Sequence, residues 1–131
     1  MSGEQTVTLE DLIFIHSAAI ARYGGASGIR DVGSLEAAAI RPYTALGGSE
    51  MFPGPFTKAA ALMESVIQRH PFLDGNKRTG VASAIYLLRK HGYQLVRVTN
   101  QQLVELSLNV AEHRMSLTEL ASWFEVHAES F

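Results

Sequence analysis

The chain has 131 residues, 47% of them hydrophobic and 18% charged, with a formal net charge of −2. This composition is that of a folded protein, so we expect a single domain over residues 1–131 with its core over about 8–128. The near-neutral charge excludes broad attraction to nucleic acid or to anionic membranes, and any anion site must therefore be local. The absence of cysteine excludes disulfides and thiolate metal sites.

The amino-terminal segment, Met1–Thr8, is polar and acidic, unlike a signal peptide. No apolar run approaches the roughly 20 residues that a membrane-spanning helix needs. We therefore expect a cytoplasmic protein that binds neither membrane nor nucleic acid.

A first helix is predicted from a capped start at Thr8–Asp11 to about Arg22. Its apolar stripe consists of Leu9, Leu12, Ile13 and Ile20. The glycine-rich residues 23–28 follow as a loop. A short second helix, Leu35–Arg41, is then expected, with Ser34 as its cap and Pro42 as its end.

Three glycines and two prolines predict a loop over residues 44–55. A third helix is predicted over about Phe56–Arg69, because its alanines are strong helix formers. Its expected buried face consists of Ala59, Leu62, Met63, Val66 and Ile67. A fourth helix should run from Asn76 to His91, with Gly92 as a left-handed cap. Its shared apolar side is expected to be Val81, Ala84, Ile85 and Leu88.

The remainder of the chain predicts two more helices and no regular strand. Tyr93–Val98 is extended at most, and capping-box patterns begin helices at about Asn100–Glu112 and Leu117–Ala128. Their expected core residues are Leu103, Leu106, Val110, Leu117, Leu120, Trp123 and Phe124. The fold class is therefore all-α, a compact single-domain bundle of about six helices with little or no strand.

The turn between the third and fourth helices departs from a local preference. Lys77 and Arg78 occupy the first turn of a helix, where partial positive charge already resides and where Asp or Glu is usual. A bound anion would offset this charge, and Gly75 can adopt the positive φ of a turn that presents free backbone N–H groups. The turn is therefore a candidate phosphate site.

Two residues beside this turn have the chemistry that phosphoryl-type transfer requires. Asp74 offers a hard oxygen ligand to a Mg²⁺ ion that bridges phosphate oxygens. His70, at the end of the preceding helix, could take a proton from an incoming hydroxyl group.

The same residues also admit a purely structural interpretation. His70 could simply cap the third helix, where the helix dipole would stabilise the imidazolium and oppose a role as base. Asp74 could be a turn residue and Asn76 an N-cap, with Lys77 and Arg78 as solvated charges.

The segment His70-Pro71-Phe72-Leu73-Asp74-Gly75-Asn76-Lys77-Arg78-Thr79 resembles the signature of the Fic/Doc superfamily, H-x-F-x-[D/E]-G-N-G/K-R. The variant here resembles the death-on-curing (Doc) branch. Further Doc-like landmarks extend over nearly the whole chain: Gly28–Asp31, Ser34–Glu36, Arg41–Pro42, Phe56, Lys58–Ala61 and His91–Tyr93. The resemblance implies a Fido-like helical domain.

The resemblance also implies ATP and Mg²⁺ as cofactors and a role for each motif residue. His70 would deprotonate a hydroxyl group of a target protein, and Asp74 would hold Mg²⁺ on the nucleotide phosphates. Phe72 would anchor the loop in the core. The anion-binding loop would consist of Gly75, Asn76, Lys77 and Arg78.

Two departures from the Fic pattern bear on the transferred group. Fic adenylyltransferases have glycine at the position of Lys77 and a second arginine at the position of Val81. The Doc branch shares both changes and is understood to transfer the γ-phosphate of a reversed nucleotide. We therefore favour protein Ser/Thr kinase activity over AMP transfer, which stays as the alternative; a non-catalytic binding module that keeps the fold is a second alternative.

The Doc branch implies a toxin that modifies a translation elongation factor and is restrained by a partner antitoxin, which inserts a helix into a groove. Many Fic enzymes instead carry their own inhibitory segment. The nearest match here, Thr6–Asp11, fails at its last position, so restraint by an antitoxin in trans is favoured.

Several other residues have open roles. Four histidines show no metal-ligand spacing: His16, His91, His113 and His127. His16 is expected to be a helix-surface or packing residue. Arg30 and Asp31 could line the site or bind the target, or they could form a structural ion pair.

Overall fold

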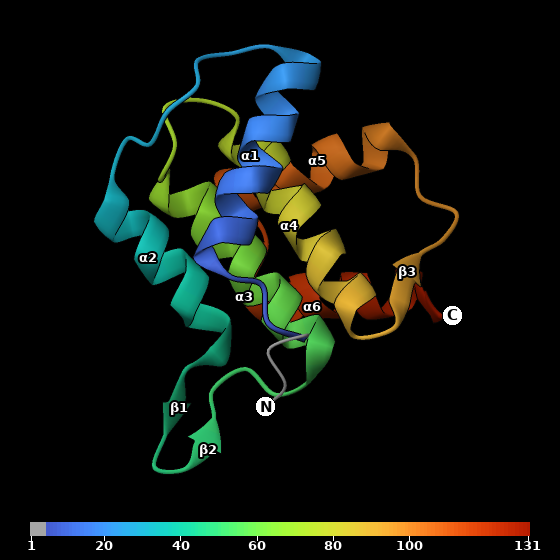
Figure 1. Ribbon diagram of the computed structural model, residues 1–131. Helices are drawn as coiled ribbons and strands as arrows, with labels where there is room; N and C mark the ends of the chain where they lie inside the picture. Colours follow the sequence, from blue (N-terminus) through green and yellow to red (C-terminus); the bar gives the residue numbers. More distant parts are fainter. Residues whose placement is uncertain (1–4) are drawn as a thin grey trace.

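The computed structural model describes residues 5–131 and has six α-helices in this part of the chain (Figure 1). They are α1 (Leu9–Tyr23), α2 (Val32–Ile40), α3 (Gly54–Arg69), α4 (Asn76–Lys90), α5 (Asn100–Ala111) and α6 (Leu117–His127). A 3-10 turn, η2 (Arg41–Tyr43), extends α2. The predicted all-α class is confirmed, while the first four residues of the polar segment Met1–Thr8 lie outside the described residues.

Strand structure in residues 5–131 is confined to two short antiparallel pairs. β1 (Ala45–Leu46) pairs with β2 (Ser49–Glu50) in a hairpin that projects from the bundle (Figure 1). β3 (Tyr93–Leu95) pairs with β4 (Ala128–Ser130), so the chain end returns to the segment after α4. The hairpin lies within the predicted loop 44–55, and α3 begins at Gly54 rather than at Phe56.

α3 is the central helix and packs against α4, α6, α2 and α5. In Figure 1, α1 and α4 lie in front of it. All five residues of its predicted apolar face are fully buried: Ala59, Leu62, Met63, Val66 and Ile67. Each large apolar side chain buried in this way contributes about 1.5–3 kcal/mol. The core around α3 thus provides a rigid base for the turn that follows it.

The packing of α3 against α4 is close at Gly80. A Cβ atom on Gly80 would lie 2.7 Å from Cγ1 of Ile67 and 3.3 Å from the carbonyl oxygen of Met63. No larger residue fits there without moving one helix. The end of α3 and the start of α4 are therefore held at a fixed spacing, and so is the turn between them.

The helix caps largely follow the predictions. Capping boxes at Thr8, Thr99 and Ser116 are all present. Gly92 has φ 87°, as expected of a left-handed cap. The prediction that Ser34 caps the second helix is wrong, because Asp31 is the cap and accepts a hydrogen bond from the backbone N–H of Ser34. Hydrogen bonds from Ser34 lower the pKa of Asp31, which keeps this cap ionised.

Several predicted apolar positions are less buried than expected, and five of them are only partly buried in α1, α5 and α6: Leu9, Ile20, Leu103, Leu117 and Trp123. Ile13 is exposed, and Val81 and Ile85 are only partly buried. The inner face of α4 instead includes Gly80, Ser83 and Leu87, beside the predicted Ala84 and Leu88. Small residues take this face because α3 approaches so closely. No helix in residues 5–131 is long and apolar enough to cross a membrane.

Candidate functional site

The turn from α3 to α4 is built from two left-handed residues. His70 ends α3 with φ 49° and ψ 57°, and Gly75 precedes α4 with φ 76° and ψ 18°. Histidine tolerates this region better than most residues with a Cβ, and glycine adopts it freely. The chain therefore reverses direction within the few residues of the predicted motif.

Asn76 holds this turn together from the inside. Its side chain is buried; its Oδ1 accepts from the N–H of Phe72 at 3.0 Å, and its Nδ2 donates to the carbonyl of Phe72 at 3.0 Å. The N-cap of α4 is Gly75, so the interpretation of Asn76 as an N-cap is wrong. Phe72 takes the oxygen and one N–H of the amide, and Nδ2 also lies 3.4 Å from Nδ1 of His70, so the side chain of Asn76 shapes the loop. The backbone N–H of Asn76 is the group that can bind a ligand.

A second loop, residues 24–31 after α1, pairs with the motif turn. The N–H of Arg30 donates to the carbonyl of Pro71 at 2.7 Å, and the N–H of Leu73 donates to the carbonyl of Gly28 at 3.1 Å. The side chain of Arg30 donates to the carbonyls of His70 (2.5 Å) and Arg69 (2.8 Å). Arg30 thus caps the carboxyl end of α3, while Asp31 caps α2. The nearby charge of Arg30 also helps to lower the pKa of Asp31.

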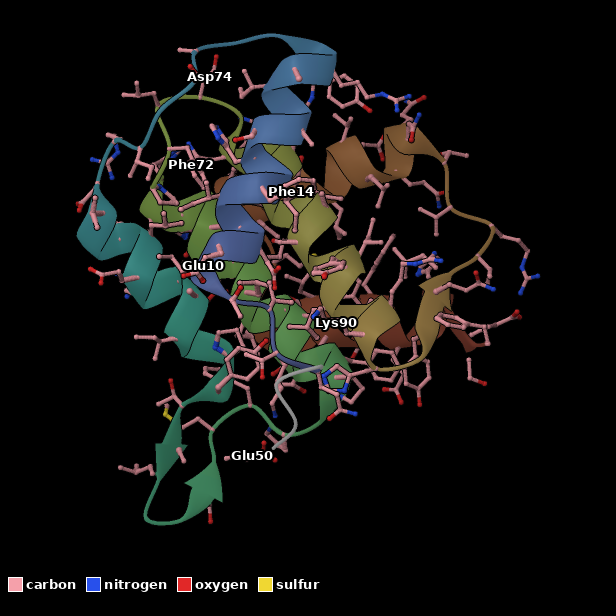
Figure 2. All side chains as sticks on the ribbon, in the orientation of Figure 1. Glu10, Phe14, Glu50, Phe72, Asp74 and Lys90 are labelled. Carbon is pink, nitrogen blue, oxygen red and sulfur yellow. The ribbon has the colours of Figure 1, made fainter. Side chains whose placement is uncertain are left out.

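Asp74 lies exposed at the tip of the turn, next to the loop after α1 (Figure 2). Its Oδ1 accepts from the N–H of Gly75 at 2.8 Å, and its Oδ2 accepts from the N–H of Ala26 at 3.3 Å. Gly25 must lack a side chain here, because a Cβ atom would lie 2.7 Å from Oδ2 of Asp74. The carboxylate is held in one place, and each oxygen keeps a lone pair for a further ligand.

A cavity of about 360 Å³ lies between the end of α1 and the motif turn. Its lining residues are Ala19, Ile20, Tyr23, Gly24, Gly25, Asp74, Gly75, Asn76, Lys77 and Arg78. α4 begins here with no side-chain cap and no acidic residue in its first turn. Free N–H groups and two exposed cations therefore face one cavity, the arrangement that binds phosphate groups.

The guanidinium of Arg78 is placed by an aromatic ring. Its central carbon lies 4.1 Å from the centroid of the Tyr23 ring, and Tyr23 lines the same cavity. A stacked guanidinium keeps its N–H groups free at the edge, where they can bind a phosphate in a bidentate manner. Sequence reasoning gave Tyr23 no role, because a tyrosine at a helix end is ordinary.

A family model described as the Fic/DOC family matches residues 6–88. The chain is 32% identical over 115 residues to the protein kinase doc of Escherichia phage P1, an alignment that covers 88% of this chain and 89% of that protein. The chain belongs to the Fic/DOC family. It is also 42% identical over 73 residues to the toxin Doc of Mycolicibacterium smegmatis, 56% of each chain.

His70 of the Fic/DOC motif is exposed and turned toward the start of α4. Its Nδ1 lies 3.4 Å from Nδ2 of Asn76, and it is not among the residues that line the cavity. The N–H of Asn76 favours a ring with its lone pair on Nδ1. This contact is long and therefore weak, and solvent around an exposed ring allows the other tautomer, in which Nε2 accepts a proton.

Metal binding by protein groups alone is not supported. Within residues 5–131 no three His, Cys, Asp or Glu side chains lie close enough to hold an ion. Asp74 alone suits a Mg²⁺ ion that takes its remaining ligands from nucleotide phosphates and water, which is how this ion usually binds. The donor set therefore fits a metal that arrives with a nucleotide rather than a resident one.

Proposed function

We propose that this Fic/DOC protein is a Doc-type toxin that transfers the γ-phosphate of ATP, with Mg²⁺, to a Ser or Thr hydroxyl of a target protein. The observation that carries the proposal is the joint placement of an exposed histidine, a fixed carboxylate and a cationic helix start at one turn. The name of the phage P1 relative, a protein kinase, supports the same reaction class.

Each motif residue then has a step in the reaction. Nε2 of His70 takes the proton of the target hydroxyl as its oxygen attacks the γ-phosphorus. The bond from that phosphorus to the β–γ bridging oxygen breaks, and ADP leaves. Lys77, Arg78 and the N–H group of Asn76 stabilise the negative charge on the phosphates. Mg²⁺ held by Asp74 would supply further charge neutralisation.

The kinase reaction is favoured over AMP transfer by two residues. Lys77 adds a charged side chain to the first turn of α4, and Val81 leaves no second arginine one turn later. Arg78, stacked on Tyr23, is then the guanidinium of the cavity wall. Lys77 and Arg78 both lie in the first turn of α4. From there they would stabilise the negative charge on the phosphate group that is transferred.

Labelled ATP separates the two reactions directly. With γ-labelled ATP we expect the target protein to become labelled, and with α-labelled ATP we expect none above background. A bacterial translation extract provides the acceptor, because the resemblance to the Doc branch implies a translation elongation factor as the target. Label from the α-position, with none from the γ-position, would replace the kinase by an AMP transferase.

We further propose that an antitoxin restrains the enzyme in trans, through a carboxyl-terminal helix that binds a groove of this domain. The nearest match to an inhibitory segment within the chain, Thr6–Asp11, has Asp11 where that segment ends in glycine or asparagine, which favours restraint in trans. The non-catalytic alternative, a binding module, predicts that the same turn binds no nucleotide.

A further inference from the structure

His16 is a buried residue of α1 that the proposed chemistry does not use. Its side chain belongs to the core, with 3% of the residue exposed. Its ring stacks flat on that of Phe72, with centroids 3.8 Å apart and 4° between the planes. Its Nε2 lies 2.8 Å from the carbonyl oxygen of Asp74. One side chain therefore contacts two residues of the motif turn.

The contact with the carbonyl oxygen shows which ring nitrogen of His16 carries a proton. A carbonyl oxygen only accepts hydrogen bonds, so Nε2 of His16 must carry the proton and donate it. The neutral ring in this tautomer and the protonated ring make the same bond.

The hydrogen bond from His16 to the carbonyl of Asp74 lies in the part of the turn whose groups would bind the nucleotide. Fixing the carbonyl of Asp74 from the core side fixes the following peptide, and with it the N–H of Gly75 and the start of α4. Gly75 itself rests on α1, since a Cβ atom there would lie 3.2 Å from Ile20 and 3.8 Å from the His16 ring.

We propose that His16 is a positioning residue of the nucleotide site, which holds Phe72 with its ring and Asp74 with its Nε2–H. This inference rests on the proposed function for its consequence, namely that loss of the N–H weakens Mg²⁺–ATP binding. The helix α1 thereby sets the geometry of a turn 58 residues later in the chain.

Two substitutions divide the role of His16 into its parts. His16→Phe keeps a flat ring against Phe72 and removes the N–H donor. His16→Gln keeps an N–H donor and removes the ring. The matched control is His127→Phe in α6, because His127 also stacks on a ring (Trp123, 4.0 Å) and contacts a carbonyl oxygen through Nδ1 at 2.8 Å.

Two readouts are measured on each variant: calorimetry with Mg²⁺–ATP, and hydrogen exchange of the Gly75 and Thr79 amides. The Gly75 N–H bonds to the Asp74 carboxylate and the Thr79 N–H to the Gly75 carbonyl. We expect His16→Phe to weaken binding about tenfold, as the loss of one hydrogen bond would, and to speed exchange at both amides. We expect His16→Gln to recover part of the affinity and His127→Phe to match the wild type in both readouts.

Three results would overturn the inference. One is wild-type affinity and exchange in His16→Phe. Another is equal effects in His16→Phe and His127→Phe. The third is a nitrogen spectrum of the wild type in which the His16 ring is protonated on Nδ1 alone.

The exchange readout separates this inference from the proposed function. If the wild type binds no Mg²⁺–ATP, the proposed function fails, while faster exchange in His16→Phe would still support the positioning role. If His16→Phe does not fold, His16→Gln is compared with His16→Ala instead. Slower exchange of the Gly75 and Thr79 amides in His16→Gln than in His16→Ala would support the donor role, and equal exchange would contradict it.

Discussion

Replacing His70 by alanine is expected to lower phosphate transfer by about 10²- to 10⁴-fold, the range that a general base contributes. The fold should persist, because the ring is exposed and makes one long contact, with Asn76 at 3.4 Å. The measurement is the rate at which label from γ-labelled ATP enters the acceptor protein, with the melting temperature followed in parallel.

The chain offers a matched control for this variant in His113. His113 is also exposed and also has positive φ, 57° against 49° for His70. His113→Ala should therefore share the backbone cost of a left-handed alanine but keep full transfer. Asparagine tolerates the left-handed backbone region better than alanine. The His70→Asn variant should nevertheless be as inactive as His70→Ala. Full labelling by either His70 variant would exclude the role as base.

Replacing Asn76 by alanine is expected to lower the free energy of unfolding by about 2–4 kcal/mol, because the buried N–H and carbonyl of Phe72 both lose their partner. Transfer should fall as well, since the turn that carries Asp74 would lose its internal support. The measurement is denaturant unfolding of the wild type and of Asn76→Ala. The dependence of the unfolding free energy on denaturant concentration should have the same slope in both.

Asn100 provides the control for this second variant. Both asparagines are the first residue of a helix, α4 or α5, but Asn100 is exposed. Asn100→Ala should change the stability by less than about 0.5 kcal/mol. An Asn76→Ala variant as stable as Asn100→Ala would show that the amide does not hold the turn.

The helices could be predicted from sequence because their signals are local. Capping boxes at Thr8, Thr99 and Ser116 lie within four residues, and the apolar period of α3 is unbroken. Ser34 and Asp31 are both good N-cap residues. With Asp31 as the cap, α2 begins directly after Arg30, whose side chain is bound to the carboxyl end of α3. That competition depends on tertiary contacts, which a local pattern does not contain.

The candidate site was predicted as a list of residues but not as a geometry. The sequence placed His70, Asp74 and the cationic helix start at one turn, and the structure places them there. The contributions of His16 and Tyr23 come from α1, far along the chain, and no pattern within a single segment could indicate them. The side chain of Asn76 faces inward because Phe72 needs partners in the core.

The most direct test is a titration of the ¹⁵N-labelled protein with Mg²⁺–ATP, followed through its backbone amide signals. We expect the largest shifts at Gly75, Asn76, Lys77 and Arg78, and smaller shifts across Gly24 and Gly25 on the opposite wall of the cavity. Shifts centred instead on the cavity beside Phe56 and Leu117, or no shifts at saturating nucleotide, would contradict a nucleotide site at this turn.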